Sequence, residues 1–470
     1  MKYISTRQAA PALNFEDVIL QGLAVDGGLY VPEFLPQFDE KKIAQFRKLS
    51  YQELFFEVTK HFVVGAIDDD TYRKIIDKSY KNFSHQAIAP LKQLSHNHFL
   101  LELFHGPTLA FKDFALQFLG NLLDHILAKR NEKIVIIGAT SGDTGSAAIY
   151  GCMNCENADI FILHPHNRVS EVQRRQMTSV IADNVTNLAV EGNFDDCQAL
   201  VKQMFADQSF LNGKRMVAVN SINWARIMAQ IVYYFYAALQ LGSSIDRAIS
   251  FVVPTGNFGN VYAGFLVKRM GLNIAKLVVA TNANDILTRF VNNNDYSRQS
   301  LHDTISPSMN IQVSSNFERL LFDMYKNNKS ESKLGNLMRE FEKVGKLDTS
   351  AEVWKNISQI FCSYSVDDLA TKNKILQVYK NCQEVLDPHT AVAVAASDLF
   401  MASENYGGEM VVSLATAHIA KFPESLENLP VSKPQLPPFL SDLFLRKEKY
   451  QVVKNDLEQM KKVIQNFCHP

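Results

Sequence analysis

The sequence predicts an α/β protein built on doubly wound parallel sheets. Short runs of β-branched, apolar residues alternate with helix-like segments over most of the 470 residues, a pattern typical of β-α-β units. Glycine-rich turns follow several of these runs. A hydrophobic content of 47% provides a large core for more than one domain.

Six apolar runs are expected to be strands, because continuous β-branched stretches of this length are typical of strands buried on both faces. The expected strands are 134–137, 160–163, 216–219, 251–253, 277–280 and 410–412. Between them, residues 115–127, 224–241 and 261–270 carry apolar side chains at helical spacing. Ligands of such folds bind at the carboxyl ends of the strands.

The two ends of the chain differ from this core. Residues 1–90 are expected to form a separate, mostly helical region, with helices near 52–61 and 70–82. The core is expected over 91–425 as two α/β subdomains, the smaller at about 113–230. Residues 426–470 are expected to form a proline-rich connector and a terminal amphipathic helix. Its apolar residues are Val453, Leu457, Met460, Ile464 and Phe467. Residues 331–346 and 366–383 read as charged helices, a possible insertion.

Composition excludes several classes of partner. The formal net charge is −1, so no basic field attracts nucleic acid or anionic lipid. Arg7, Glu16 and Asp17 interrupt any signal-like stretch, and apolar runs such as 231–241 are too short for a membrane span. A cytoplasmic location is therefore expected. Cys152 and Cys155 form a C-x-x-C without a second ligand pair, so they are expected to be buried core residues and no metal is expected.

Three loops after expected strands have the composition of anion sites. They are residues 138–145, 255–260 and 413–418. A glycine-rich turn before a helix exposes backbone N–H groups at the positive helix end, which suits phosphate or carboxylate. None matches G-x-G-x-x-G or G-x-x-x-x-G-K-[ST]. A single loop could be a plain connector, but two in one chain favour a phosphate ligand.

Lys112 is the other candidate residue. It follows the apolar loop 105–111 and directly precedes a strongly apolar helix. A surface ion pair is the usual role of a lysine. In an apolar loop at a positive helix end, however, the pKa of an amine is lowered, as a Schiff-base lysine requires.

The motifs together resemble the threonine synthase family. The segment ELFHGPTLAFKDF at 102–114 is similar to that family's cofactor-lysine motif. Further similar segments occur in the same order over nearly the whole chain: 3–7, 22–30, 140–145, 192–196, 220–226, 254–260, 314–319, 387–390 and 416–418. The N-terminal region is similar to that of the longer bacterial and fungal branch.

The resemblance implies the fold of the tryptophan synthase β group, with pyridoxal 5'-phosphate between two subdomains. Lys112 would bind the cofactor covalently and then transfer protons, and Phe111 would lie near its ring. Thr416 would hydrogen-bond the ring nitrogen and leave it unprotonated. The implied cradle of the cofactor phosphate is Gly256, Asn257, Phe258, Gly259 and Asn260. The implied carboxylate site of the substrate is Ser141, Gly142, Asp143 and Thr144, in which Asp143 is expected to orient the loop or touch the cofactor. The implied phosphate site of the substrate is Asn220, Ser221 and Arg226.

The implied reaction is the last step of threonine biosynthesis, in which O-phospho-L-homoserine and water give L-threonine and phosphate. A serine/threonine dehydratase or a cysteine synthase fits less well, because the N-terminal region and the 220–226 segment disfavour it. The same motifs would also fit a sister lyase that acts on the same substrate, or a non-catalytic homologue that keeps the fold. The sequence leaves open whether the protein is a monomer or a homodimer, and which roles His105 and His389 have.

Three positions depart from the family pattern. Gln8 stands where glycine is usual, Asn310 where aspartate is usual, and Ile419 where proline is usual. None of the three carries an expected chemical role, so the departures concern local loop geometry.

Overall fold

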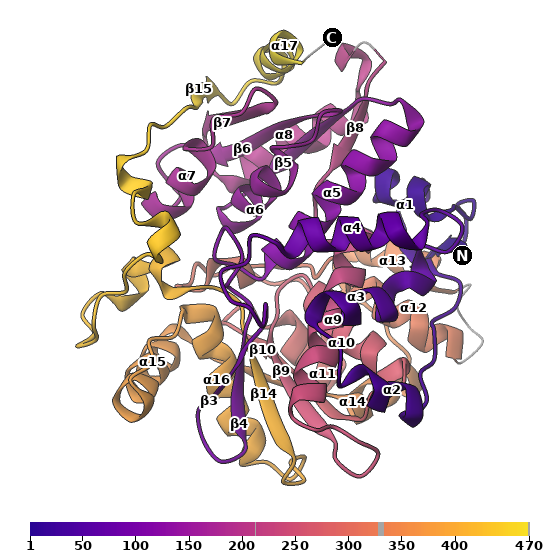
Figure 1. Cartoon of the computed structure of the whole chain (residues 1–470), viewed down its shortest axis with the longest axis vertical. Coiled ribbons are helices and arrows are strands. Elements are labelled where there is room, and N and C mark those ends of the chain that lie inside the picture. Colours follow the sequence, from indigo (N-terminus) through magenta and orange to yellow (C-terminus); the bar gives the residue numbers. More distant parts are fainter. Residues whose placement is uncertain (212, 328–332, 469–470) are drawn as a thin grey trace.

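The computed structural model describes residues 1–211, 213–327 and 333–468 and contains two main sheets. In Figure 1 the smaller sheet lies in the upper half and the larger sheet in the lower half. No described helix is long and apolar enough to cross a membrane.

The smaller sheet has five parallel strands in the order β15-β7-β6-β5-β8. Alternate residues of its strands face opposite cores. Ile134 and Ile136 contribute to the core beneath the helices α5 and α6, whereas Val135 and Ile137 contribute to the core beneath α8 and α17. Both faces are covered, which explains the uninterrupted apolar runs. The elements are β5 (Ile134–Ala139), β6 (Ala158–Pro165), β7 (Val185–Glu191), β8 (Arg215–Ala218), α5 (Lys112–Arg130), α6 (Asp143–Cys152), α7 (Glu171–Thr178) and α8 (Phe194–Ala206).

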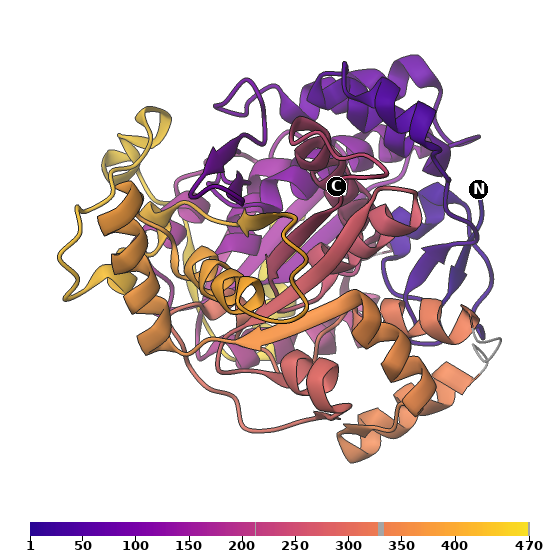
Figure 2. The same cartoon turned by 90° about the horizontal axis from the view of Figure 1, so that it is seen from below.

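The larger sheet has six strands in the order β13-β10-β9-β14-β4-β3. Five strands are parallel, and β3 is antiparallel to β4 at the edge. Helix α16 covers one face and α9 and α10 lie on the other side, so that the strands run between helices when seen from below (Figure 2). The elements are β3 (Leu91–Gln93), β4 (His98–Glu102), β9 (Ile249–Pro254), β10 (Ile274–Thr281), β13 (Phe361–Ser365), β14 (Met410–Ala415), α9 (Trp224–Gln240), α10 (Gly259–Arg269) and α16 (Pro388–Met401).

The N-terminal region is mostly helical and carries one short antiparallel strand pair. Its aromatic residues join the main core; the Tyr3 ring, for example, lies 5.9 Å from that of Trp224 in α9. Its elements are β1 (Tyr3–Ser5), α1 (Phe15–Gln21), β2 (Tyr30–Pro32), α2 (Glu40–Phe46), α3 (Tyr51–Thr59) and α4 (Asp69–Tyr80). The remaining elements between β10 and α16 are α11 (Ile286–Asn293), β11 (Tyr296–Ser297), α12 (Phe317–Asn327), α13 (Leu334–Val344), β12 (Lys346–Leu347), α14 (Ala351–Ile360) and α15 (Asp368–Cys382).

The C-terminal segment corrects one expectation. The terminal helix α17 spans Leu457–Phe467, and Val453 belongs to strand β15 (Gln451–Lys454), which pairs in parallel with β7. Val453 is buried in the same core as Met460 and Ile464, so its apolar spacing reflects a shared core and not one helix. The yellow chain in Figure 1 runs from the lower half up to α17 and so connects the two halves.

The six expected strands are confirmed. The strands β3, β4, β7, β13 and β15 of the two main sheets and the short pairs β1–β2 and β11–β12 were missed. The expected helices at 115–127, 224–241, 261–270 and 366–383 correspond to α5, α9, α10 and α15. Of the expected helix at 331–346, residues 331 and 332 lie outside the described residues and α13 forms most of the rest. Cys152 and Cys155 are both buried free thiols, at the end of α6 and just after it.

The three departures from the family pattern have local explanations. Gln8 has a φ of 60°, a left-handed conformation that glycine adopts without strain. The Asn310 side-chain oxygen accepts hydrogen bonds from Asn282, Asn284 and Thr304, as a carboxylate would. Ile419 is the first residue of the short helix η5 (Ile419–Lys421), a position that suits proline.

Candidate active site

Lys112 begins helix α5 and lies next to the segment that follows strand β14. The Phe111 N–H donates to the Thr416 carbonyl at 2.8 Å, and the His418 N–H donates to the Leu109 carbonyl at 3.0 Å. Leu109 has a φ of 62°, so the lysine loop makes a tight turn before the helix. The structure thus brings Phe111 and Lys112 next to Thr416, which lies about 300 residues further along the chain.

The Lys112 amine is almost completely buried. The side chain is 12% exposed, and Nζ lies 3.3 Å from Asp143 Oδ2 and 3.5 Å from Ser308 Oγ. Burial lowers the pKa of Lys112; the Asp143 carboxylate opposes this shift, whereas the charges of Lys421 and Arg226 add to it. A lowered pKa increases the share of neutral amine, which is the form that reacts with an aldehyde.

Asp143 is held between two lysines. Its Oδ1 also forms an ion pair with Lys421 Nζ at 2.9 Å and accepts a hydrogen bond from Gln173 Nε2 at 2.9 Å. Burial would raise the pKa of Asp143, but Lys421 and Lys112 outweigh that effect and hold it well below its usual range. Sequence reasoning missed Lys421, since nothing local to a lysine at position 421 indicates an aspartate at 143.

The loop before α6 presents free donors. The Thr140 hydroxyl accepts hydrogen bonds from the N–H groups of Gly142 and Gly145, both at 2.9 Å. No described residue accepts from the N–H groups of Ser141, Asp143 or Thr144. Gly142 has a φ of 144°, and a Cβ there would lie 2.4 Å from the Gln173 side chain. The loop therefore has the geometry of an anion site at a helix N-terminus.

The loop before α10 presents a second set of donors. Within the described chain, no acceptor takes a hydrogen bond from any N–H group of residues 256–260. The side chain of Phe258 turns into the core, 5.4 Å from the Phe317 ring, so the loop offers backbone and not side-chain groups. A Cβ on Gly256 would lie 2.9 Å from the Ser308 carbonyl oxygen, which leaves no room for a larger residue. Five adjacent free donors suit a phosphate.

Arg226 is a buried cation near the start of α9. It is 4% exposed, and its Nε has no hydrogen-bond partner among the described residues. No described carboxylate forms an ion pair with it, and burial lowers its pKa to about 10. The Asn260 Nδ2 is likewise unpaired. Buried unpaired donors of this kind are typical of a site whose ligand is an anion.

Of the two other expected phosphate ligands, Asn220 is exposed and Ser221 is half-buried. The Asn220 side-chain oxygen accepts from the Ile222 N–H at 3.0 Å, and Asn220 lines a cavity of about 810 Å³ with Gly138 and Ala139. The Ser221 hydroxyl lies 3.0 Å from that of Ser315, which in turn donates to the Asn257 side chain at 3.2 Å. Ser221 is thereby linked to the loop before α10.

Two histidines have positions that the sequence left open. His389 Nδ1 lies 2.9 Å from Asp387, and its Nε2 accepts from the Ser308 N–H at 3.2 Å. His389 thus binds the backbone of Ser308, whose hydroxyl lies 3.5 Å from Lys112 Nζ. His105 Nε2 lies 2.7 Å from Glu102.

Thr416 completes the site. It is buried, its carbonyl accepts from Phe111, and its N–H donates to the Thr390 hydroxyl at 3.3 Å. No described residue hydrogen-bonds to the Thr416 hydroxyl itself. The hydroxyl is therefore available to a ligand.

The fold and the site together define a class of enzyme. A buried amine, two free backbone anion cradles and an available hydroxyl fit an aldehyde cofactor that carries a phosphate and a ring nitrogen. A sequence model of pyridoxal-phosphate dependent enzymes matches residues 85–341. The protein is a pyridoxal-phosphate-dependent enzyme of fold type II, and its cofactor is pyridoxal 5'-phosphate.

The comparisons also identify the family within that class. Models of the threonine synthase N terminus and C-terminal region match residues 2–80 and 390–464. The threonine synthase of Pseudomonas aeruginosa is 56% identical over 461 residues, covering 98% of this chain and 97% of that protein. The one from Saccharomyces cerevisiae is 40% identical and covers 98% and 97%. The chain belongs to the threonine synthase family.

Solved structures agree with the assignment. The structure of pyridoxal-phosphate-bound threonine synthase from Brucella melitensis has a TM-score of 0.95 and 46% identity, and covers 99% of each chain. The yeast threonine synthase structure has a TM-score of 0.94 and 40% identity, and covers 99% of this chain and 98% of that chain.

Proposed function

We propose that this protein is a threonine synthase, which converts O-phospho-L-homoserine and water to L-threonine and phosphate. The observation that carries the proposal is the buried, unpaired guanidinium of Arg226. The N–H groups of 256–260 already suit one phosphate, that of the cofactor, so Arg226 provides for a second. A substrate with its own phosphate explains both sites.

Each group of the site has a distinct part in the proposed reaction. The bound cofactor supplies an electron sink that makes protons next to the substrate amino group removable. Lys112 removes the Cα proton and then a Cβ proton, and the bond between Cγ and its oxygen breaks to release phosphate. Lys112 then returns one proton to Cγ and one to Cα, and water adds at Cβ and gives up a proton. The free N–H groups of Ser141 and Thr144 in the loop before α6 hold the substrate carboxylate, whereas the N–H group of Gly142, also expected there, already donates to the Thr140 hydroxyl. Asn220, Ser221 and Arg226 hold its phosphate, with Arg226 as a bidentate donor.

Thr416 and Phe111 position the cofactor ring in this proposal. A hydroxyl hydrogen-bonds to the ring nitrogen without protonating it, which favours elimination and replacement over transamination. Replacement of Thr416 by aspartate is expected to increase the share of transamination products. The measurement is the ratio of keto acid to threonine at equal substrate consumption, with Thr390→Ser as a conservative control. An unchanged ratio in Thr416→Asp would mean that Thr416 is not the ring partner.

Incubation with O-phospho-L-homoserine tests the proposed function. Phosphate and threonine are expected to appear in a one-to-one ratio. Phosphate with a keto acid in place of threonine would indicate the sister lyase, and no reaction in the presence of bound cofactor would indicate a non-catalytic homologue.

We also propose the division into 1–90, 91–425 and 426–470 and a cytoplasmic location. The substrate is a small molecule, and monomer or homodimer stays open to a sedimentation measurement.

A further inference from the structure

We propose that Lys421 is a positioning residue that keeps Asp143 ionised and fixed while the nitrogen of Lys112 changes its partners. The inference rests on the proposed function only for the catalytic consequence. The arrangement itself consists of one buried carboxylate between two lysines, of which only Lys112 has been given a chemical role.

The position of Lys421 is fixed on all sides. Its side chain is 0% exposed, and Nζ lies 2.9 Å from Asp143 Oδ1 and donates to the Thr108 carbonyl at 2.6 Å. The Lys421 carbonyl accepts from the Ser170 hydroxyl at 3.1 Å. A fully buried ammonium is retained only where it is paired and hydrogen-bonded.

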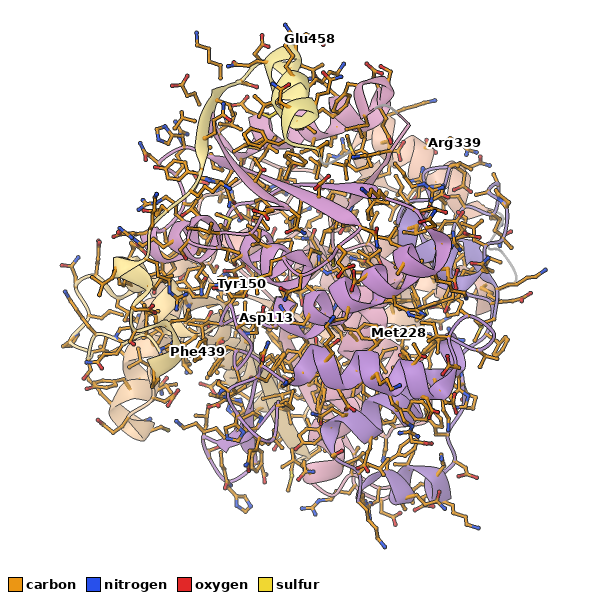
Figure 3. The ribbon with its side chains drawn as sticks, turned by 45° about the horizontal axis from the view of Figure 1, so that its top comes forward. Asp113, Tyr150, Met228, Arg339, Phe439 and Glu458 are labelled. Atoms are coloured by element: carbon orange, nitrogen blue, oxygen red, sulfur yellow. The ribbon has the colours of Figure 1, made fainter. Side chains whose placement is uncertain are left out.

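Lys421 also joins the two loops that carry the charged pair. Thr108 lies in the lysine loop, and its N–H and hydroxyl donate to Asp113 at 2.8 and 2.7 Å. Burial raises the pKa of Asp113 to about 6, with Thr108 and Lys421 acting in the opposite direction. Asp113 is labelled near the middle of the molecule in Figure 3, whereas Arg339 and Glu458 are labelled near its edges. Because Lys421 Nζ contacts both the Thr108 carbonyl and Asp143, it links the loop that precedes Lys112 to the loop that contains Asp143.

The charge of Lys421 matters because Lys112 cannot serve as a permanent counter-ion. In the proposed reaction Lys112 binds the cofactor, is released from it, and gains and loses protons. If Lys112 were its only cation, Asp143 would be a buried carboxylate without a counter-charge whenever Lys112 is neutral. The other groups that face the pair are Gln173, His389 and Arg226. Gln173 carries no charge, and no described ion pair joins His389 or Arg226 to Asp143, so Lys421 is the second ammonium of the arrangement.

Removing the charge of Lys421 has a defined effect on Lys112. In Lys421→Met, which keeps an apolar stem of similar volume, Asp143 acts on Lys112 alone and the repulsion from Lys421 is lost. Both changes raise the pKa of Lys112, since a lost like charge and a nearby carboxylate each favour the protonated amine. We expect Lys421→Met to lower kcat/KM for phosphohomoserine about ten- to a hundredfold, with partial recovery in Lys421→Arg.

The test uses the full-length protein in its cofactor-free and cofactor-bound forms. The pH dependence of Lys112 acylation is measured in the cofactor-free protein by peptide mass spectrometry, for wild type, Lys421→Met, Asp143→Asn and the double variant. Lys461→Met is the control, since Lys461 forms a 2.8 Å ion pair with Asp207 away from the site. Thermal unfolding is followed for each protein, so that a misfolded variant is recognised.

The expected result is an acylation midpoint at higher pH in folded Lys421→Met, a wild-type midpoint in Lys461→Met, and a double variant that resembles Asp143→Asn in kcat/KM. The midpoint of the double variant is expected above that of Asp143→Asn, because the repulsion between Lys421 and Lys112 is lost. A wild-type midpoint in folded Lys421→Met, or losses in the double variant that multiply those of the two single variants, would overturn the inference. If Lys421→Met does not fold, a midpoint in Asp143→Asn equal to that of wild type overturns it, and a lower midpoint supports it. The acylation result is independent of phosphohomoserine turnover, so failure of the proposed function is recognised separately.

Discussion

Lys112→Ala is expected to lose turnover of phosphohomoserine by at least about 10⁴-fold. One amine performs both proton removals and the later proton return in the proposed reaction, and a single positioned acid or base contributes about 10²–10⁴-fold on its own. The five free N–H groups of 256–260 remain in the variant, so it is expected to retain the cofactor without a covalent bond. Phosphate release measures the rate.

Borohydride reduction distinguishes a lost covalent bond from a lost cofactor. In wild type it is expected to fix the cofactor on the peptide that contains Lys112, and in Lys112→Ala on no peptide. Lys129→Ala is the matched control, because Lys129 lies on the same helix α5 but at its surface, paired with Glu16 at 2.7 Å. Label on another lysine of the wild type would contradict the assignment.

Arg226→Met is expected to lower kcat/KM about ten- to a hundredfold and to leave cofactor occupancy near that of wild type. The loss of a charge-assisted contact to phosphate costs about 1.5–3 kcal/mol. Because the guanidinium has no counter-ion in the described chain, its removal is not expected to destabilise the ligand-free fold. Inorganic phosphate is expected to raise the Tm of the cofactor-bound wild type, since a ligand stabilises the state that binds it, but not that of the variant.

Arg319 provides a control in the same core. It is also buried, and its pKa is also lowered to about 10 by burial. Its guanidinium, however, donates to the carbonyls of Tyr30 and Ile222 and to the Asn316 side chain. Arg319→Met is therefore expected to lower stability by roughly 3 kcal/mol or more. Loss of cofactor from Arg226→Met, or normal kinetics with phosphohomoserine, would reject Arg226 as the ligand of the substrate phosphate.

Local patterns in the sequence predicted the strands that bury both faces and the loops that follow them. Runs such as 134–137 and 251–253 are continuous because helices cover both sides of each sheet, and the apolar composition alone carries that information. Strand β4 was missed because its apolar run, 99–101, contains no β-branched residue and lies between His98 and Glu102. Strand β15 was missed because a short strand at a sheet edge has the same apolar spacing as the start of a helix.

The parts of the site that depend on distant pairing could not be predicted. Lys421 and Asp143 are brought together only when the segment after β14 packs against α7, and neither position has a local signal for the other. The Ser308 hydroxyl lies near Lys112, and the Ser308 N–H donates to His389, which belongs to α16. The similarity to threonine synthase included 387–390 and 416–418, but a motif does not state which groups its members contact.

Turnover of O-phospho-L-homoserine in water enriched in ¹⁸O tests the central claim most directly. The proposed reaction breaks the bond between Cγ and the bridging oxygen, so phosphate keeps its four original oxygens and the water oxygen is added at Cβ. Mass spectrometry is expected to find one ¹⁸O in the threonine formed and none in the phosphate. Label in the phosphate with homoserine as the product would show simple phosphate-ester hydrolysis and would contradict the account.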